Sequence, residues 1–239
     1  MNTIHFVMMG KGGVGKSLIS VILAQYLKER GNDLKCADLD PTNASFNAYK
    51  ALQAEHINIA DSDFNVDPSQ FDVLMEKILT AECDWVIDTG AATFLPFMNY
   101  LIRNEVFSFL AEADRRIVIH TPLVGGPAME ETIRGLKTIL ELGTTPVVVW
   151  ENEFFGLVAM NGKSFIQTSG YEQFKSRVLG LVRLAKGDPK LDEKDMLTMN
   201  SRRLTWGEAL ADENFMLMQR QRLTVMRREI YKQLDQVEM

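Results

Sequence analysis

The segment from Gly10 to Ser17 has the glycine and lysine spacing of a phosphate-binding loop. The pattern G-x-x-x-x-G-K-[ST] is matched by Gly10-Lys11-Gly12-Gly13-Val14-Gly15-Lys16-Ser17. The glycines allow the backbone to turn tightly, so that successive N–H groups point at a phosphate. We expect Lys16 to reach the β- and γ-phosphates and the Ser17 hydroxyl to bind Mg²⁺. A helix from Leu18 would add the N–H groups of its first turn to this anion site.

Acidic residues close two apolar runs further along the chain. Asp38 and Asp40 stand at the end of the run 34–39, and Asp88 follows the run 85–87. Ligands of a parallel sheet bind beyond the carboxyl ends of its strands, where these carboxylates would meet the phosphate loop. A single Asp at a strand end is as often a cap or turn residue. Two such segments downstream of a phosphate loop favour a metal–nucleotide site, with Asp88 as the Mg²⁺ carboxylate.

The elements that must position these residues alternate between strand and helix. Strands are predicted over 3–9, 34–39, 85–87, 117–120, 147–150 and 178–184, and helices over 18–30, 71–79, 94–110 and 128–142. Residues 153–171 are predicted to be an irregular excursion. A long C-terminal helix is indicated by the apolar spacing of Leu223, Met226, Ile230, Leu234 and Val237. This order predicts an α/β fold, a mostly parallel P-loop NTPase sheet with helices on both faces. We expect a single domain over 1–239, with a C-terminal helical segment at about 205–236.

Composition excludes several other classes of protein. The chain has 239 residues and a formal net charge of −6, which argues against wholesale coating of DNA. It has no apolar run of the roughly 20 residues needed to span a bilayer. Two cysteines, Cys36 and Cys83, are too few for a disulfide scaffold or a four-cysteine zinc site. We therefore expect a cytoplasmic protein with reduced thiols.

Lys11 narrows the class of nucleotide-binding protein. A second lysine inside the loop, together with Asp38-Leu39-Asp40-Pro41 and Val86-Ile87-Asp88, resembles the deviant Walker A ATPases, the family of ParA and MinD. The resemblance implies ATP as the nucleotide and a homodimer in which Lys11 reaches the partner's phosphates, as an arginine finger does. It also implies that Asp40 orients the attacking water, that Asp38 and Asp88 lie around Mg²⁺, and that Asn152 contacts the adenine.

Further segments resemble conjugative transfer proteins of plasmids. They are residues 43–46, 118–121, 148–150, 162–165 and 220–223. This resemblance implies slow ATP hydrolysis that serves plasmid transfer or DNA positioning, with proteins of the conjugation machinery as partners. One segment departs from the wider family, because Thr89-Gly90-Ala91-Ala92 stands where a proline-containing switch is usual. That departure concerns the coupling of hydrolysis to partner release and leaves nucleotide binding untouched.

Alternative interpretations remain for the function and for two segments. The nucleotide could order a non-hydrolysing adaptor, or the chain could be a small-molecule kinase, although no arginine-rich lid is evident. Five basic residues of the C-terminal helix could contact DNA or a membrane, but its regular apolar stripe favours packing on the sheet. Gly162-Lys163-Ser164 is no second phosphate loop, because Leu157 stands where a glycine is needed. His120 is predicted to be structural.

Overall fold

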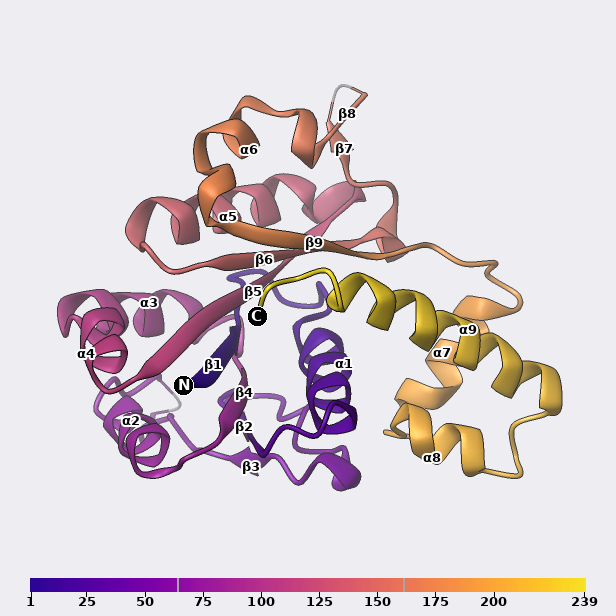
Figure 1. The fold of residues 1–239 in the computed structure, drawn as a ribbon, viewed down its shortest axis with the longest axis horizontal. Coiled ribbons are helices and arrows are strands. Elements are labelled where there is room, and N and C mark those ends of the chain that lie inside the picture. The colour runs from indigo at the N-terminus through magenta and orange to yellow at the C-terminus, as the bar shows by residue number, and fades with distance from the viewer. Residues whose placement is uncertain (64, 161) are drawn as a thin grey trace.

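A seven-stranded parallel sheet forms the centre of the computed structural model, which describes residues 1–63, 65–160 and 162–239 (Figure 1). The strand order is β3-β2-β4-β1-β5-β6-β9, and every neighbouring pair is parallel. The strands are β1 (Asn2–Val7), β2 (Leu34–Asp38), β3 (Glu55–His56), β4 (Asp84–Asp88), β5 (Arg115–Val124), β6 (Val147–Asn152) and β9 (Val178–Leu184). The predicted α/β class and parallel sheet are therefore confirmed.

Helices cover both faces of this sheet, as predicted. One face carries α1 (Lys16–Glu29), α7 (Asp192–Ser201), α8 (Trp206–Ala211) and α9 (Leu217–Leu234). The other carries α2 (Gln70–Thr80), α3 (Phe94–Arg103), α4 (Val106–Glu112) and α5 (Met129–Leu142). Two apolar cores result, one on each side of the sheet, because alternate residues of each strand point to opposite faces.

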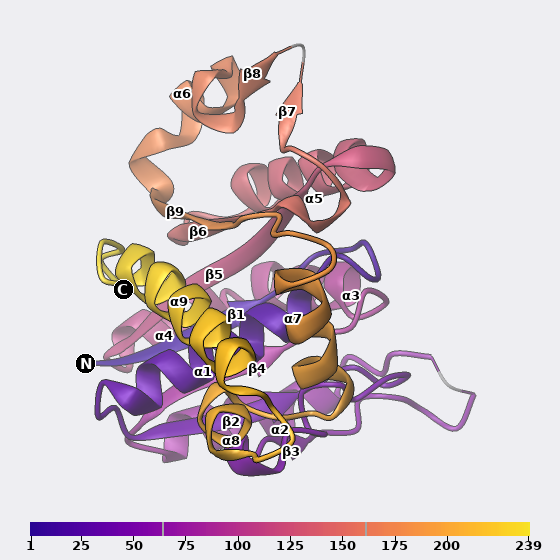
Figure 2. The same cartoon turned by 90° about the vertical axis from the view of Figure 1, so that its right-hand side faces the viewer.

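The C-terminal helix α9 packs through its apolar stripe into the core between α1 and the sheet. Leu223, Ile230 and Leu234 are buried, and α9 lies across α1 with α7 and α8 beside its first half (Figure 2). Two of its basic residues form ion pairs with other elements of the chain: Arg222 pairs with the buried Asp195 at 2.7 Å, and Arg227 pairs with Glu29 of α1 at 3.6 Å. These contacts confirm the packing interpretation of the stripe. The segment 205–236 contains two helices, α8 and α9.

Several predicted elements differ from the structure. The strand predicted over 3–9 ends at Val7, and the strand predicted over 147–150 continues to Asn152. The helix predicted over 94–110 is broken between α3 and α4, where Glu105 adopts a left-handed φ of 51°. A residue with a positive φ cannot continue a right-handed helix, which explains the break. The break was not predicted, because the apolar spacing continues on both sides of it. Strand β5 extends beyond the predicted 117–120 to Val124. The last residue pair between β1 and β5 joins Val7 to His120, and Pro122 lies beyond this pair in β5.

The predicted excursion after β6 contains short ordered elements. Two strands of two residues each, β7 (Ala159–Met160) and β8 (Lys163–Ser164), form an antiparallel hairpin. The hairpin leads into α6 (Ser169–Phe174), which lies above α5 in Figure 2. Ser164 caps a 3₁₀ turn over Phe165–Gln167. Gly162-Lys163-Ser164 thus lies in a hairpin that leads into a helical turn. The strand β7 precedes this segment, although the sequence predicted no strand there. Within the described residues, no helix is long and apolar enough to cross a membrane.

Candidate nucleotide-binding site

Three strand ends bring the predicted site residues to one edge of the sheet. β1 leads into the phosphate loop (residues 10–17), and it lies between β4 and β5 in the sheet. Asp88 stands in register with both Val7 and Asp38. Because parallel strands share one carboxyl edge, the acidic ends of β2 and β4 lie beside the loop, as the sequence predicts.

The loop conformation depends on glycine at two positions. Gly13 has φ of 74° and Gly15 has φ of 100°, both in the left-handed region. Gly15 is also the N-cap of α1 and has no side chain to cap the first turn. The N–H groups of that turn therefore remain directed at the loop, where an anion can accept from them. Gly10 is close-packed as well, since a Cβ there would lie 2.9 Å from the Phe94 ring.

Lys16 is buried inside its own loop. Its side chain is 8% exposed, and its amine donates to the carbonyl of Lys11 at 3.1 Å. Burial lowers the pKa of the Lys16 amine, and the carboxylates of Asp88 and Asp40 act in the opposite direction. A buried ammonium close to two carboxylates and a phosphate loop is suited to binding a phosphate anion.

Asp88 carries the chemistry of a cation ligand. It is buried at the end of β4 and accepts a hydrogen bond from the Ser20 hydroxyl at 2.9 Å. Burial raises the pKa of the Asp88 carboxyl to about 7, opposed by the neighbouring Ser17 and reinforced by the charge of Asp38. Mg²⁺ is usually held by one or two carboxylates together with phosphate oxygens and water. The Ser17–Asp88 pair therefore fits Mg²⁺. No cluster of three metal-ligating side chains occurs in the described part of the chain.

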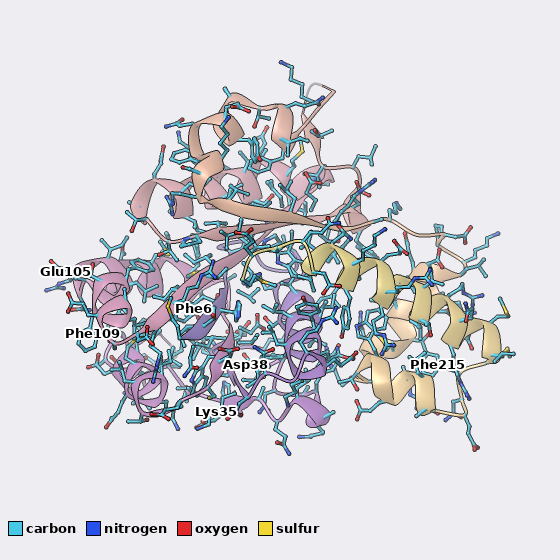
Figure 3. The ribbon with its side chains drawn as sticks, in the orientation of Figure 1. Phe6, Lys35, Asp38, Glu105, Phe109 and Phe215 are labelled. Carbon is cyan, nitrogen blue, oxygen red and sulfur yellow. The ribbon has the colours of Figure 1, made fainter. Side chains whose placement is uncertain are left out.

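Asp38 anchors the loop that follows β2. Its Oδ1 accepts from the backbone N–H of Asp40, and its Oδ2 accepts from those of Phe46 and Asn47, all at 2.9–3.0 Å. Burial raises the pKa of the Asp38 carboxyl, and these backbone hydrogen bonds oppose the rise. Asp38 lies in the interior, whereas Lys35 of the same strand is at the periphery (Figure 3). A carboxylate with three donors can contribute charge to the site while it fixes the loop.

Asp40 is held against the segment after β4. Its Oδ1 accepts from the N–H groups of Thr42 and Asn43, at 2.9 and 3.1 Å. A Cβ on Gly90 would come within 2.9 Å of the Asp40 carboxylate, so glycine permits this close approach. The hydroxyl of Thr93 donates to the carbonyl of Leu39, which joins the two segments. These contacts hold the Asp40 carboxylate next to Gly90.

Lys11 has the opposite placement to Lys16. Its side chain is 41% exposed, and its amine forms a 2.7 Å ion pair with Glu131 in the first turn of α5. The two lysines of the loop thus divide between the interior of the site and the molecular surface. Sequence reasoning singled out Lys11 but could not find Glu131, which is distant in the chain.

Asn152 lies against the loop at the end of β6. Its amide donates to the Val14 carbonyl at 3.1 Å and accepts from the N–H of Phe154, and its Nδ2 is 2.8 Å from where a Gly15 Cβ would be. A cavity of about 650 Å³ begins here and extends between α7 and α9. Its walls are mostly apolar, which suits a nucleobase. The first turn of α1, including Leu18, lines it too.

Sequence reasoning missed the far wall of this cavity. That wall includes Lys186 and Gly187, after β9, and Glu193 and Met196 of α7. The turn signal Gly187-Asp188-Pro189, directly after a predicted strand, could have indicated residues at the carboxyl edge. Nothing local indicates α7, because only packing brings it there.

Other polar groups considered from the sequence have structural partners. Trp150 donates from Nε1 to His120 Nδ1 at 3.1 Å, and His120 Nε2 lies 3.0 Å from His5 Nδ1. His120 is therefore structural, as predicted. Arg115 and Arg116 begin β5, at the opposite end of that strand from the loop, and donate to backbone carbonyls. That placement offers no support for a kinase lid.

The fold and the loop define a P-loop nucleotide-binding α/β protein. Residues 5–199 match the CobQ/CobB/MinD/ParA nucleotide binding domain, and the chain belongs to that family. Protein TraL of Escherichia coli is 40% identical over 237 residues, which cover 98% of each chain. Both resemblances predicted from the sequence are thereby confirmed.

Solved structures show the same fold at low identity. A plasmid partition protein of Borrelia burgdorferi bound to AMPPNP is 16% identical, with a TM-score of 0.53 over 95% of this chain and 98% of that one. The MinD cell division protein of Aquifex aeolicus is 13% identical, with a TM-score of 0.52 over 97% and 98%.

Proposed function

We propose that this chain is an ATP- and Mg²⁺-dependent switch that forms a homodimer, hydrolyses ATP slowly and serves plasmid conjugative transfer or DNA positioning. One observation carries the proposal: Lys16 is buried in its own site, whereas the Lys11 amine is directed to the surface. An exposed amine on a phosphate loop is available to the phosphates of a second copy. Hydrolysis then depends on dimerisation, because a cation from the partner stabilises the transition-state charge.

Each remaining site residue has a role that its contacts support. The loop N–H groups and Lys16 hold the phosphates, while Ser17 and Asp88 hold Mg²⁺, which neutralises phosphate charge when bound. Asp40 orients the attacking water with the carboxylate oxygen that its two backbone donors leave free. Asn152 contacts the adenine base at the mouth of the cavity, where its bond to the Val14 carbonyl places its amide.

A second candidate is a nucleotide-binding adaptor that does not hydrolyse ATP. It is favoured by the segment 89–93, whose hydroxyls hold it to two strand ends. Thr89 donates to the Val7 carbonyl at 3.1 Å and Thr93 to that of Leu39 at 3.2 Å. A segment held this way would transmit the state of the nucleotide poorly. Retention of ATP without phosphate release, under all partner conditions, would favour the adaptor.

Light scattering with ATP, with ADP and without nucleotide tests the switch. The wild type should dimerise only with ATP, and Asp40→Ala should retain ATP and remain dimeric. Lys11→Ala should bind ATP, because Lys16 is intact, but should neither dimerise nor hydrolyse it. A wild type that stays monomeric throughout, or Lys11→Ala that hydrolyses normally, would contradict the proposal.

A further inference from the structure

The ion pair between Lys11 and Glu131 connects the phosphate loop to α5. The Lys11 amine lies 2.7 Å from Glu131 Oε2, and the two side chains are 41% and 43% exposed. Both residues line a surface groove of about 420 Å³ with Phe94 and Leu95 of α3. The pair therefore stands on the open face of the loop, where another molecule can reach the Lys11 amine.

Local structure favours a charged Glu131 at this position. The residue lies in the first turn of α5, where the helix dipole stabilises a negative charge. The preceding residue, Glu130, lies in the same turn and is exposed. Among the described residues, Glu130 has no ion pair. The adjacent positions thus share charge and helix position but differ in their contact with the loop.

We propose that Glu131 is a positioning residue for Lys11, holding its amine within its own chain until the phosphates of a second nucleotide-bound copy displace the carboxylate. The inference rests on the proposed dimer switch and adds a residue that sets the dissociation constant of the dimer. An amine bound to Glu131 must leave it before it can donate to another chain. Dimerisation therefore opens one such pair in each copy and is opposed by both.

The expected effect is modest, because the pair is half exposed. Solvent-exposed ion pairs change an equilibrium about 1.4-fold to 5-fold. Two pairs open per dimer, so removing the carboxylate should lower the dimer dissociation constant about 2-fold to 30-fold. Salt screens exposed pairs, and the gain should therefore shrink as ionic strength rises.

The test compares Glu131→Gln with the matched control Glu130→Gln. Dimer dissociation constants with ATP are measured by sedimentation for the full chain, in about 0.05 M and 0.5 M salt. Both substitutions remove one exposed charge from the same helical turn, and thermal melting checks that both fold. Glu131→Gln should tighten the dimer at low salt and lose most of that gain at high salt, while Glu130→Gln should match the wild type.

The outcomes separate this inference from the proposed function. A wild-type dimer that Glu131→Gln leaves unchanged, weakens, or tightens no more than Glu130→Gln does would overturn the role of Glu131 alone. If neither the wild type nor Glu131→Gln dimerises with ATP, the switch and this inference fall together. A gain that persists unchanged in high salt would show that the effect does not arise from the ion pair.

Discussion

Replacing His5 by Asn should make the protein less sensitive to acid. The indole N–H of Trp150 can only donate, so His120 Nδ1 must accept and His120 Nε2 carries the proton. That proton is donated to His5 Nδ1, across 3.0 Å. The Asn carbonyl can accept the same proton but does not titrate. His5 and His120 are buried, so the chain of hydrogen bonds requires both rings to be neutral.

The size of the effect follows from the pKa of His5. Burial lowers that pKa from 6.5 to about 4. Because the folded value lies below the unfolded one, stability is full above about pH 6.5 and is lost as the pH falls towards 4. At pH 5 the unfolded chain binds this proton while the folded chain does not, which costs about 2 kcal/mol of unfolding free energy. Burial, the main cause of the lowered pKa of His120, is present in both the wild type and the variant, whereas the smaller contribution from the charge of His5 is removed with that residue.

Urea unfolding at pH 7 and pH 5 measures this effect. The wild type should lose about 2 kcal/mol more than His5→Asn over this interval, the share of one histidine. The comparison uses the change with pH, so any packing cost of the substitution cancels. Equal losses for both proteins would refute the neutral histidine chain. A larger loss for the variant would mean that His5 is charged in the folded protein.

Three further predictions concern the site. Lys16→Ala should weaken ATP binding at least about tenfold, by calorimetry, because a buried charge-assisted contact is removed; normal affinity would exclude Lys16 from the phosphate site. Asp88→Asn should abolish the increase in ATP affinity that Mg²⁺ gives over EDTA, since a neutral amide cannot balance the cation; a retained increase would place the metal elsewhere. Asn152→Ala should lower the unfolding free energy by about 1–3 kcal/mol in urea titrations, because the substitution breaks two hydrogen bonds of the side chain. No loss of stability would contradict its role against the loop.

The features that could be predicted from the sequence depend on residues that are close together along the chain. The phosphate loop could be predicted because residues 13 and 15 need positive φ, which glycine supplies at low cost. The strand ends at Asp38 and Asp88 could be predicted because apolar runs stop there. Strand β9 has the predicted bounds, since its apolar pattern has clear borders. The break at Glu105 escaped prediction, because a left-handed residue between two apolar helices leaves no periodic signal.

Pattern and glycine placement along the chain determined which residues could surround a nucleotide. Only the tertiary structure decided how they are divided between the interior and the surface. It set Lys16 inside its site and Lys11 against Glu131, and it gave Asp38 three backbone donors. It also brought α7 and α9 to the cavity beside Asn152. Spacing along a chain encodes local conformation, whereas an ion pair or a cavity wall depends on which distant segments pack together.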